Sequence, residues 1–206
     1  MDLKTFLFVA PIVLGSLTLH ELAHAWVAWR LGDPTAHERG RITLNPLAHL
    51  DPLGTTMFAL TALLSNFPFG WAKPVPVDPR YFRRPKEGMA LVGAAGPAMN
   101  FVVALVCLFL FRHVGLSPFW ANVLGKAYIV NVVLGLFNLI PVPPLDGSRI
   151  VGAAMDNATY YRWIQLDQYG MLIVFGLVIV FRGQFTALLA DGVNAVTRVM
   201  DVIVAA

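Results

Sequence analysis

The chain has 206 residues, of which 57% are hydrophobic and 13% charged, and its mean hydropathy is +0.67. These values lie well outside the usage of soluble domains and indicate an integral membrane protein. The net charge of +3 does not indicate nucleic-acid binding, because basic residues in loops beside membrane spans act as topology signals. The single cysteine, Cys107, excludes an internal disulfide.

The first apolar stretch runs from about Leu3 to Trp29, long enough to cross a bilayer. We expect it to stay in the mature protein, because no convincing small-residue cleavage site precedes the motif it carries. That motif is H-E-L-A-H, in which His20 and His24 leave one face of a helix and could bind one metal ion. Glu21 beside them could take a proton from water at the metal. An ionisable cluster at membrane depth is usually functional, with a chance match as the alternative.

Basic residues on both sides of the next apolar run predict the topology. The first span is followed by Arg30, Arg39 and Arg41. The second long span is preceded by Lys73, Arg80, Arg83, Arg84 and Lys86. Both loops should be cytoplasmic, so the run from Pro52 to Gly70 must enter and leave on one side, as a re-entrant or interfacial hairpin. At 1.5 Å per residue, His24 lies about 9 Å and His20 about 15 Å below the cytoplasmic end of the first span.

Three more apolar stretches follow, from about Gly88 to Phe111, Val114 to Leu145 and Tyr169 to Phe181. Asp146 comes directly after the second of them and after prolines that prevent a regular helix. Broken backbone at membrane depth indicates a polar cavity. Because catalytic zinc sites use three protein ligands and one open position, Asp146 is the best candidate for the third ligand. The alternative is a solvated turn or a helix N-cap.

The last segment predicts an amphipathic helix. Its apolar positions are Phe185, Leu188, Leu189, Val193, Val196, Val199, Met200 and Ile203. We expect this helix to lie on the membrane or to pack against the bundle, with a tilted final span as the alternative. No repeat or linker divides the chain, so we expect one membrane-embedded domain over residues 1–206, with a catalytic core over about 1–155 and the C-terminal span and amphipathic helix over about 156–206.

Three motifs together resemble the site-2 protease family, which consists of intramembrane zinc metalloproteases of peptidase family M50. They are H-E-x-x-H in a transmembrane helix, Gly96-Pro97-Ala98-Met99-Asn100 opening a second helix, and N-x-x-P-x-x-P-x-D-G near a third, ending at Gly147. The resemblance covers the chain to about Ile150 and is to the compact prokaryotic branch without PDZ or CBS domains. It implies that His20, His24 and Asp146 bind one Zn²⁺ per chain and that Glu21 is the general base.

Other polar residues are candidates for substrate binding or for stabilising the oxyanion. Asn138 matches the family pattern, and an uncharged amide donor suits that task. Asn131 and Asn100 are further candidates, and interhelical hydrogen bonds are the alternative for all three. The resemblance also implies a membrane-associated β element, for which we consider Trp71 to Val77, including Val75, pairing with Arg41 to Leu44. Such an edge strand could bind a substrate by β-augmentation, and a plain proline-rich connector is the alternative.

We therefore expect an all-α polytopic membrane protein, a bundle of about four to six transmembrane helices with a re-entrant or interfacial segment and a small β element. The expected function is hydrolysis of peptide bonds in or near transmembrane segments of membrane proteins. The expected location is a prokaryotic inner membrane, with the active site nearer the cytoplasm. A metal transporter could also place His and Asp in the membrane but would not need Glu21 as a base, and an inactive zinc-binding scaffold is a third reading.

Overall fold

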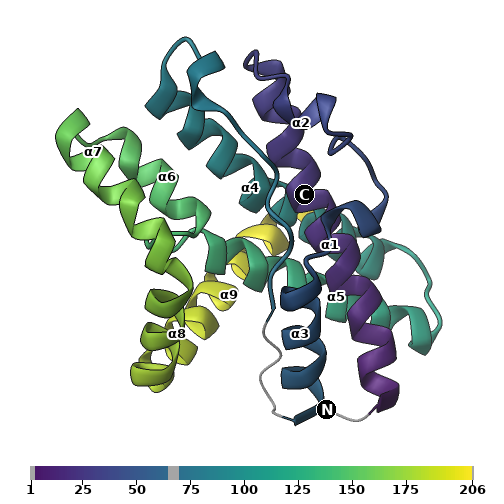
Figure 1. The fold of residues 1–206 in the computed structure, drawn as a ribbon. Helices are drawn as coiled ribbons and strands as arrows, with labels where there is room; N and C mark the ends of the chain where they lie inside the picture. The colour runs from purple at the N-terminus through teal and green to yellow at the C-terminus, as the bar shows by residue number, and fades with distance from the viewer. Residues whose placement is uncertain (1–2, 65–69, 206) are drawn as a thin grey trace.

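The computed structural model describes residues 3–64 and 70–205 and, within them, is built from helices (Figure 1). The α-helices are α1 (Leu3–Arg30), α2 (Thr35–Glu38), α3 (Pro52–Leu64), α4 (Pro85–His113), α5 (Pro118–Asn138), α6 (Asp146–Ala153), α7 (Asn157–Ile164), α8 (Gly170–Val180) and α9 (Arg182–Ala205). Short 3-10 helices cover Pro46–His49, Pro79–Tyr81 and Gln165–Tyr169. The expected all-α class is confirmed.

Three segments of the described chain are long and apolar enough to cross a membrane. They are α4, α5 and the continuous helical run Asn157–Val180, which joins α7 and α8. Most residues in these segments are not buried by the protein, so their apolar side chains face outward, as contact with lipid requires. The protein is therefore an integral membrane protein. The expected count of four to six spans is reached only if α1 also crosses, and its 28 residues would extend about 42 Å.

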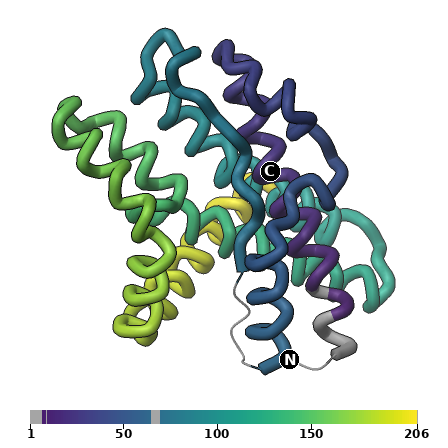
Figure 2. The backbone as a smooth tube through the Cα atoms, in the orientation of Figure 1, coloured from purple at the N-terminus to yellow at the C-terminus, as the bar shows by residue number. Residues whose placement is uncertain are grey.

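Helix α4 lies at the centre of the bundle and contacts α1, α5, α6 and α9. One core cluster joins Ala104, Cys107 and Leu108 of α4 to Tyr128 and Val132 of α5 and to Met200 and Val204 of α9. Helix α9 thus packs against α4 and α5, as the sequence predicts, through part of the expected apolar face, namely Val193, Val196 and Met200, whereas Leu188, Val199 and Ile203 are exposed. Figure 2 shows the course of α9 behind the bundle. Helix α5 ends at Asn138, well before the expected end of the apolar stretch at Leu145, because the prolines of the following loop cannot continue a helix.

The segment around α3 is a hairpin whose two ends meet. Leu50 and Ala72 form an isolated antiparallel β-bridge, and the amide of Lys73 donates to the carbonyl of His49 at 2.8 Å. Just inside this neck, a Cβ atom on Gly54 would lie 2.2 Å from the carbonyl oxygen of Trp71, so only glycine allows so close an approach. Residues 65–69 lie outside the described part of the chain. Residues 50 and 72, on either side of this segment, are therefore neighbours, as a re-entrant or interfacial hairpin requires.

The expected β element between α1 and α4 needs correction. In the described ranges the chain forms no strand there, and the Leu50–Ala72 bridge is the only β pairing in them. Arg41 meets the proline-rich segment through its side chain, whose Nη2 donates to the Lys73 carbonyl at 2.6 Å. The physical reason is that Pro74 and Pro76 have no amide hydrogen, so the segment cannot form a continuous ladder with any neighbour.

The hairpin generates a topology prediction. In a Cys107→Ala background, single cysteines at the exposed positions Arg39 and Arg83 should react with an impermeant maleimide from the cytoplasmic face only. A cysteine at Ser117 should react from the opposite face, because α4 crosses the membrane between Arg83 and Ser117. Labelling in inside-out and right-side-out vesicles provides the measurement. Reaction of positions 39 and 83 from opposite faces would show that the α3 segment crosses.

Candidate metal centre

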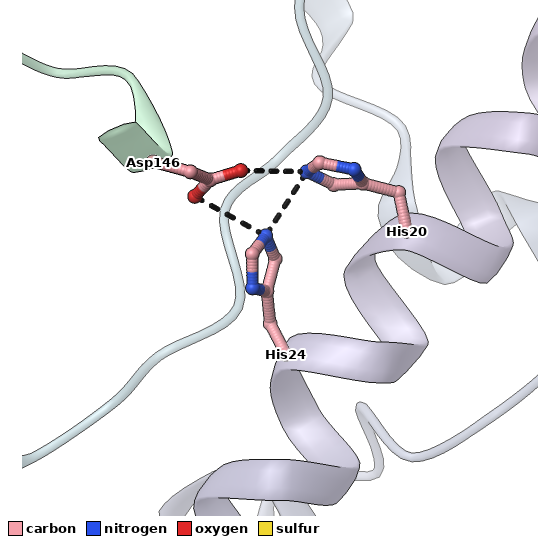
Figure 3. Close-up of side chains that lie close together, drawn as sticks. All are labelled: His20, His24 and Asp146. Carbon is pink, nitrogen blue, oxygen red and sulfur yellow. Dashed lines mark hydrogen bonds and ion pairs between the residues drawn. The ribbon is translucent and has the colours of Figure 1, made fainter. Parts of the chain in front are cut away.

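The structure brings together the three residues expected to bind a metal. His20 and His24 lie one turn apart on α1, and both are buried, with 5% and 8% of their surface exposed. Asp146, the first residue of α6, faces them (Figure 3). Its Oδ2 lies 3.1 Å from Nε2 of His20 and its Oδ1 lies 3.3 Å from Nε2 of His24. The two Nε2 atoms are 3.0 Å apart.

The loop before α6 turns the chain so that Asp146 reaches this point. It contains Pro141, Pro143 and Pro144. Because proline has no amide hydrogen to donate, the helix of α5 cannot continue through this loop. Gly147 then passes so close to the end of α5 that a Cβ atom would lie 2.2 Å from the carbonyl oxygen of Leu139. Glycine at position 147 therefore permits the close contact with Leu139 that brings Asp146 to the two histidines.

In each imidazole the second ring nitrogen, Nδ1, makes a hydrogen bond to a group outside the candidate metal site. Nδ1 of His24 lies 2.7 Å from the carbonyl oxygen of Val92, and Nδ1 of His20 lies 2.6 Å from Oδ1 of Asn100. Both partners are oxygens that only accept hydrogen bonds, so each Nδ1 carries the proton. In a neutral imidazole the remaining Nε2 then presents a lone pair. Both lone pairs point to the space in front of Asp146.

A cation fits this space. The Asp146 atom Oδ2 is buried and accepts no hydrogen bond from the described residues, and the facing His20 and His24 nitrogens bring lone pairs rather than protons. Such a set of buried acceptors is costly unless a positive charge pairs with it. Ligands held tetrahedrally at about 2.0–2.1 Å from zinc lie about 3.3 Å from one another, close to the separations of 3.0–3.3 Å found here. These three residues are the candidate metal site in the described part of the chain.

Helix α4 closes the back of the site through a glycine. A Cβ atom built on Gly96 would lie 2.5 Å from Cε1 of His20 and 2.5 Å from Nε2 of His24. On the same face, a Cβ atom on Gly93 would lie 2.9 Å from the carbonyl oxygen of Asp146. The glycines of α4 therefore let its backbone approach both ligand-bearing helices, which is the packing role that small residues have between membrane helices.

Glu21, the expected base, meets the proline-rich segment. Its Oε2 accepts a hydrogen bond from the backbone amide of Val75 at 3.0 Å. The segment is also held at its far end, where the fully buried Asp33 accepts from the amide of Asp78 through Oδ2 at 2.7 Å. Together with the Arg41 contact to Lys73, these bonds lay the segment across the motif on α1. The Glu21–Val75 bond could not be inferred from the sequence, since it joins residues 54 positions apart.

The three asparagines occupy different environments. Asn100 and Asn131 are fully buried and bonded to each other, and Asn131 also bonds to Ser16 on α1. Asn138, at the C-terminal end of α5, donates from Nδ2 to the carbonyl oxygen of Leu134 at 3.0 Å. Sequence reasoning missed Ser16, although its spacing of four residues before His20 places it on the same face of α1.

An apolar cavity of about 480 Å³ lies beside this site, between α1, α3, α5 and α9. Leu17 of α1 lines it, one turn before Glu21, and so does Ala72, three residues before Val75. Its lining is almost entirely apolar, and Thr55 and the buried His49 are the exceptions.

Comparison with known proteins identifies the family. The model of peptidase family M50 matches residues 115–182. The chain is 37% identical over 194 residues to the Bacillus subtilis protein named "Putative zinc metalloprotease YwhC", a match that covers 90% of this chain and 85% of that protein. The chain belongs to peptidase family M50, the site-2 protease family of zinc metalloproteases.

Two further known proteins are similar to much of the chain. The Mycolicibacterium smegmatis protein named "Putative zinc metalloprotease Rip2" is 34% identical over 182 residues, covering 84% of this chain and 67% of that protein. The solved site-2 protease of Methanocaldococcus jannaschii aligns with a TM-score of 0.48 and 20% identity, over 90% of this chain and 74% of that one.

The glycine at the back of the site generates a prediction. Gly96→Ala should lower the metal content sharply, because its methyl group would overlap both imidazoles and push their Nε2 atoms apart. Gly125→Ala on α5 is the matched control, since a Cβ atom there meets nothing within 4 Å. Zinc per chain in the purified protein, determined by elemental analysis, provides the measurement. A Gly96→Ala protein with one zinc per chain would contradict the proposed packing of α4 against the ligands.

Proposed function

We propose that the protein is an intramembrane zinc endopeptidase that hydrolyses peptide bonds in or near the transmembrane segments of other membrane proteins. The observation that carries the proposal is the convergence of His20, His24 and Asp146 in a chain of membrane-spanning helices, with Glu21 beside them. Two histidines and a carboxylate, with a position left for water or substrate, form the donor set of a catalytic zinc site. Membership of family M50 supports the same chemistry.

In this proposal His20, His24 and Asp146 hold one Zn²⁺ per chain. The ion, when bound, polarises the scissile carbonyl and lowers the pKa of water. Glu21 takes the proton of the attacking water on its carboxylate and returns it to the leaving amine. Because Oε2 of Glu21 accepts from the Val75 amide, this bond holds the carboxylate in one orientation beside the metal ligands. The apolar surroundings exclude bulk water and strengthen these electrostatic interactions.

The asparagines divide into two groups in this scheme. The buried hydrogen bonds of Asn100 and Asn131 favour a role between helices rather than contact with substrate. Asn138 is partly accessible, ends α5 and precedes the loop that leads to Asp146. We therefore assign the oxyanion or substrate-backbone role to Asn138 alone among the three.

The membrane arrangement follows from the same elements. Helix α1 is the fourth crossing, the α3 hairpin returns to its own side, and the basic loops on either side of the hairpin face the cytoplasm. The metal site then lies within the membrane, nearer the cytoplasmic face of a prokaryotic inner membrane. Residues 1–206 act as one membrane-embedded peptidase domain, with the catalytic core over about 1–155.

Substrate binding requires unwinding, because a transmembrane helix holds its carbonyls in internal hydrogen bonds. The segment around Val75 lies against Glu21, so an unwound stretch of substrate would meet the proposed base beside this segment. The apolar cavity that reaches Leu17 and Ala72 suits the part of the substrate that stays apolar. The substrate class is therefore a membrane protein or a transmembrane peptide, with the lipid bilayer as the surrounding partner and no nucleic acid.

The proposed roles predict distinct outcomes for substitutions at the site. Glu21→Gln should keep one zinc per chain but reduce the rate of peptide hydrolysis by about 10²- to 10⁴-fold, the usual contribution of a general base. His20→Ala and Asp146→Ala should lose both zinc and activity. The exposed Glu87 supplies the control, since Glu87→Gln should change neither. Elemental analysis and cleavage of a transmembrane peptide with and without chelator are the measurements. Near-normal turnover in Glu21→Gln would refute the mechanism and leave the transporter and scaffold readings.

The backbone amide of Val75 provides a second prediction. Val75→Pro removes the donor that orients the Glu21 carboxylate, so cleavage should fall while zinc content stays normal. Val75→Ala keeps the amide and should cleave nearly as well as the parent. Substrates with Gly, Pro or Asn near the scissile bond should be cut faster than uniform Leu helices, because they unwind at lower cost. Full activity in Val75→Pro would show that the Val75 amide does not orient Glu21, and equal rates for both substrates would show that unwinding does not limit cleavage.

A further inference from the structure

A line of buried hydrogen bonds leads from the metal site across three helices. Nδ1 of His20 on α1 bonds to Oδ1 of Asn100 on α4 at 2.6 Å. Nδ2 of Asn100 donates to Oδ1 of Asn131 on α5 at 3.0 Å. Asn100 and Asn131 are both completely buried, so water cannot replace either partner. The orientation of a zinc ligand is thus connected to a residue that does not touch the metal site.

The line ends on backbone carbonyls, which can only accept hydrogen bonds. Nδ2 of Asn131 donates to the carbonyl oxygen of Ala127 and to Oγ of Ser16, both at 2.8 Å. The Ser16 hydroxyl donates in turn to the carbonyl oxygen of Ile12 at 2.8 Å. Beyond Asn131 the line therefore has two branches, which end on the backbone carbonyls of Ala127 and Ile12. These carbonyls can only accept, so the direction of the hydrogen bonds that lead to them cannot reverse.

These fixed ends determine the direction of every bond. Asn131 must turn its Nδ2 to Ala127, so its Oδ1 faces Asn100. Asn100 must then turn its Nδ2 to Asn131, so its Oδ1 faces His20. An amide oxygen facing Nδ1 requires a proton on Nδ1 and leaves the lone pair on Nε2. If either amide turned over, two like groups would face each other where no water reaches.

We propose that Asn100 and Asn131 are positioning residues that set the tautomer and ring orientation of His20 and thereby present its Nε2 to the metal, with Asn131 acting through Asn100. The other ligand histidine is set differently, because Nδ1 of His24 meets the Val92 carbonyl directly. The backbone thus orients His24, whereas two side chains, which substitution can change, orient His20. The proposal rests on the zinc site of the proposed function but not on peptide hydrolysis.

Zinc affinity, measured by competition with a chelator in detergent, is the first readout. Asn100→Leu has about the same size but no acceptor for Nδ1 of His20, and it should weaken zinc binding by about 10- to 100-fold. Asn131→Leu should weaken it on the order of 10-fold, because Asn100 loses the partner that orients it. Asn100→Asp keeps an acceptor for His20 and loses only the donor to Asn131, so it should keep most of the affinity while the thermal stability falls.

A spectroscopic readout separates positioning from a purely structural role. In the zinc-loaded protein with nitrogen-15-labelled histidine, the ring resonances of His20 and His24 should both show a protonated Nδ1. Asn131→Leu should change the His20 resonances and leave those of His24 unchanged, since Val92 orients His24 independently. If the Leu variants fail to fold, Asn131→Ala removes the amide without adding bulk, and the same two changes are expected.

The chain offers two controls. Tyr128 on α5, close to Asn131, donates a 2.6 Å hydrogen bond to Thr197 on α9, so Tyr128→Phe loses an interhelical bond with no link to the metal. It should lower stability and leave zinc affinity unchanged. Ser16→Ala removes only one acceptor of the Asn131 amide, and the Ala127 carbonyl still sets the direction, so affinity should stay near that of the parent.

Parental zinc affinity in both Asn100→Leu and Asn131→Leu would overturn the proposal. An equal loss of affinity in Tyr128→Phe would also overturn it, because the effect would then be one of general stability. A parent protein that binds zinc but cleaves no peptide would refute the peptidase function and leave the positioning role intact. A parent protein that binds no zinc would refute both.

Discussion

The structure depends on three side-chain groups that can only accept hydrogen bonds or bind a cation where they meet inside an apolar helical bundle. The lone pairs of His20 and His24 face the carboxylate of Asp146, with 3.0–3.3 Å between neighbouring atoms. Without a cation, this arrangement would bury a charge and several lone pairs with no donor, at a cost of several kcal/mol. The protons of the imidazoles must therefore be accepted elsewhere, and α4 supplies both acceptors. The same helix must come very close to α1, which explains why glycine is present at position 96.

The features that the sequence predicts correctly depend on local patterns. The spacing of His20 and His24 and the prolines before Asp146 both act over a few residues. Each of these signals has a direct physical meaning, namely helix periodicity and missing backbone donors. The topology that the basic loops around α3 indicate stays a prediction, with which the Leu50–Ala72 bridge is consistent.

The features that the sequence does not predict depend on which faces of apolar helices meet. Helices α4 and α5 are apolar on all sides, so periodicity does not show that Asn100 and Asn131 face each other and that Asn100 faces His20. The Glu21 contact to the Val75 amide could not be foreseen for another reason, since it joins a helix to an irregular segment 54 positions away. The prediction of a β element was wrong for a different reason. The family pattern suggested a strand, but Pro74 and Pro76 leave too few backbone N–H donors to form one.

The order of the ligands along the chain has a consequence for biosynthesis. Translation proceeds from the N-terminus, and membrane segments fold as they emerge. His20 and His24 are made early, and α4 then supplies the acceptors behind both rings. Asp146 follows only after α5 and its proline loop, so the ion can be held by all three side chains only when most of the chain exists. A ribosome-bound fragment that ends before residue 146 carries Glu21 and two of the three candidate metal ligands, and the candidate site is therefore incomplete until α6 begins.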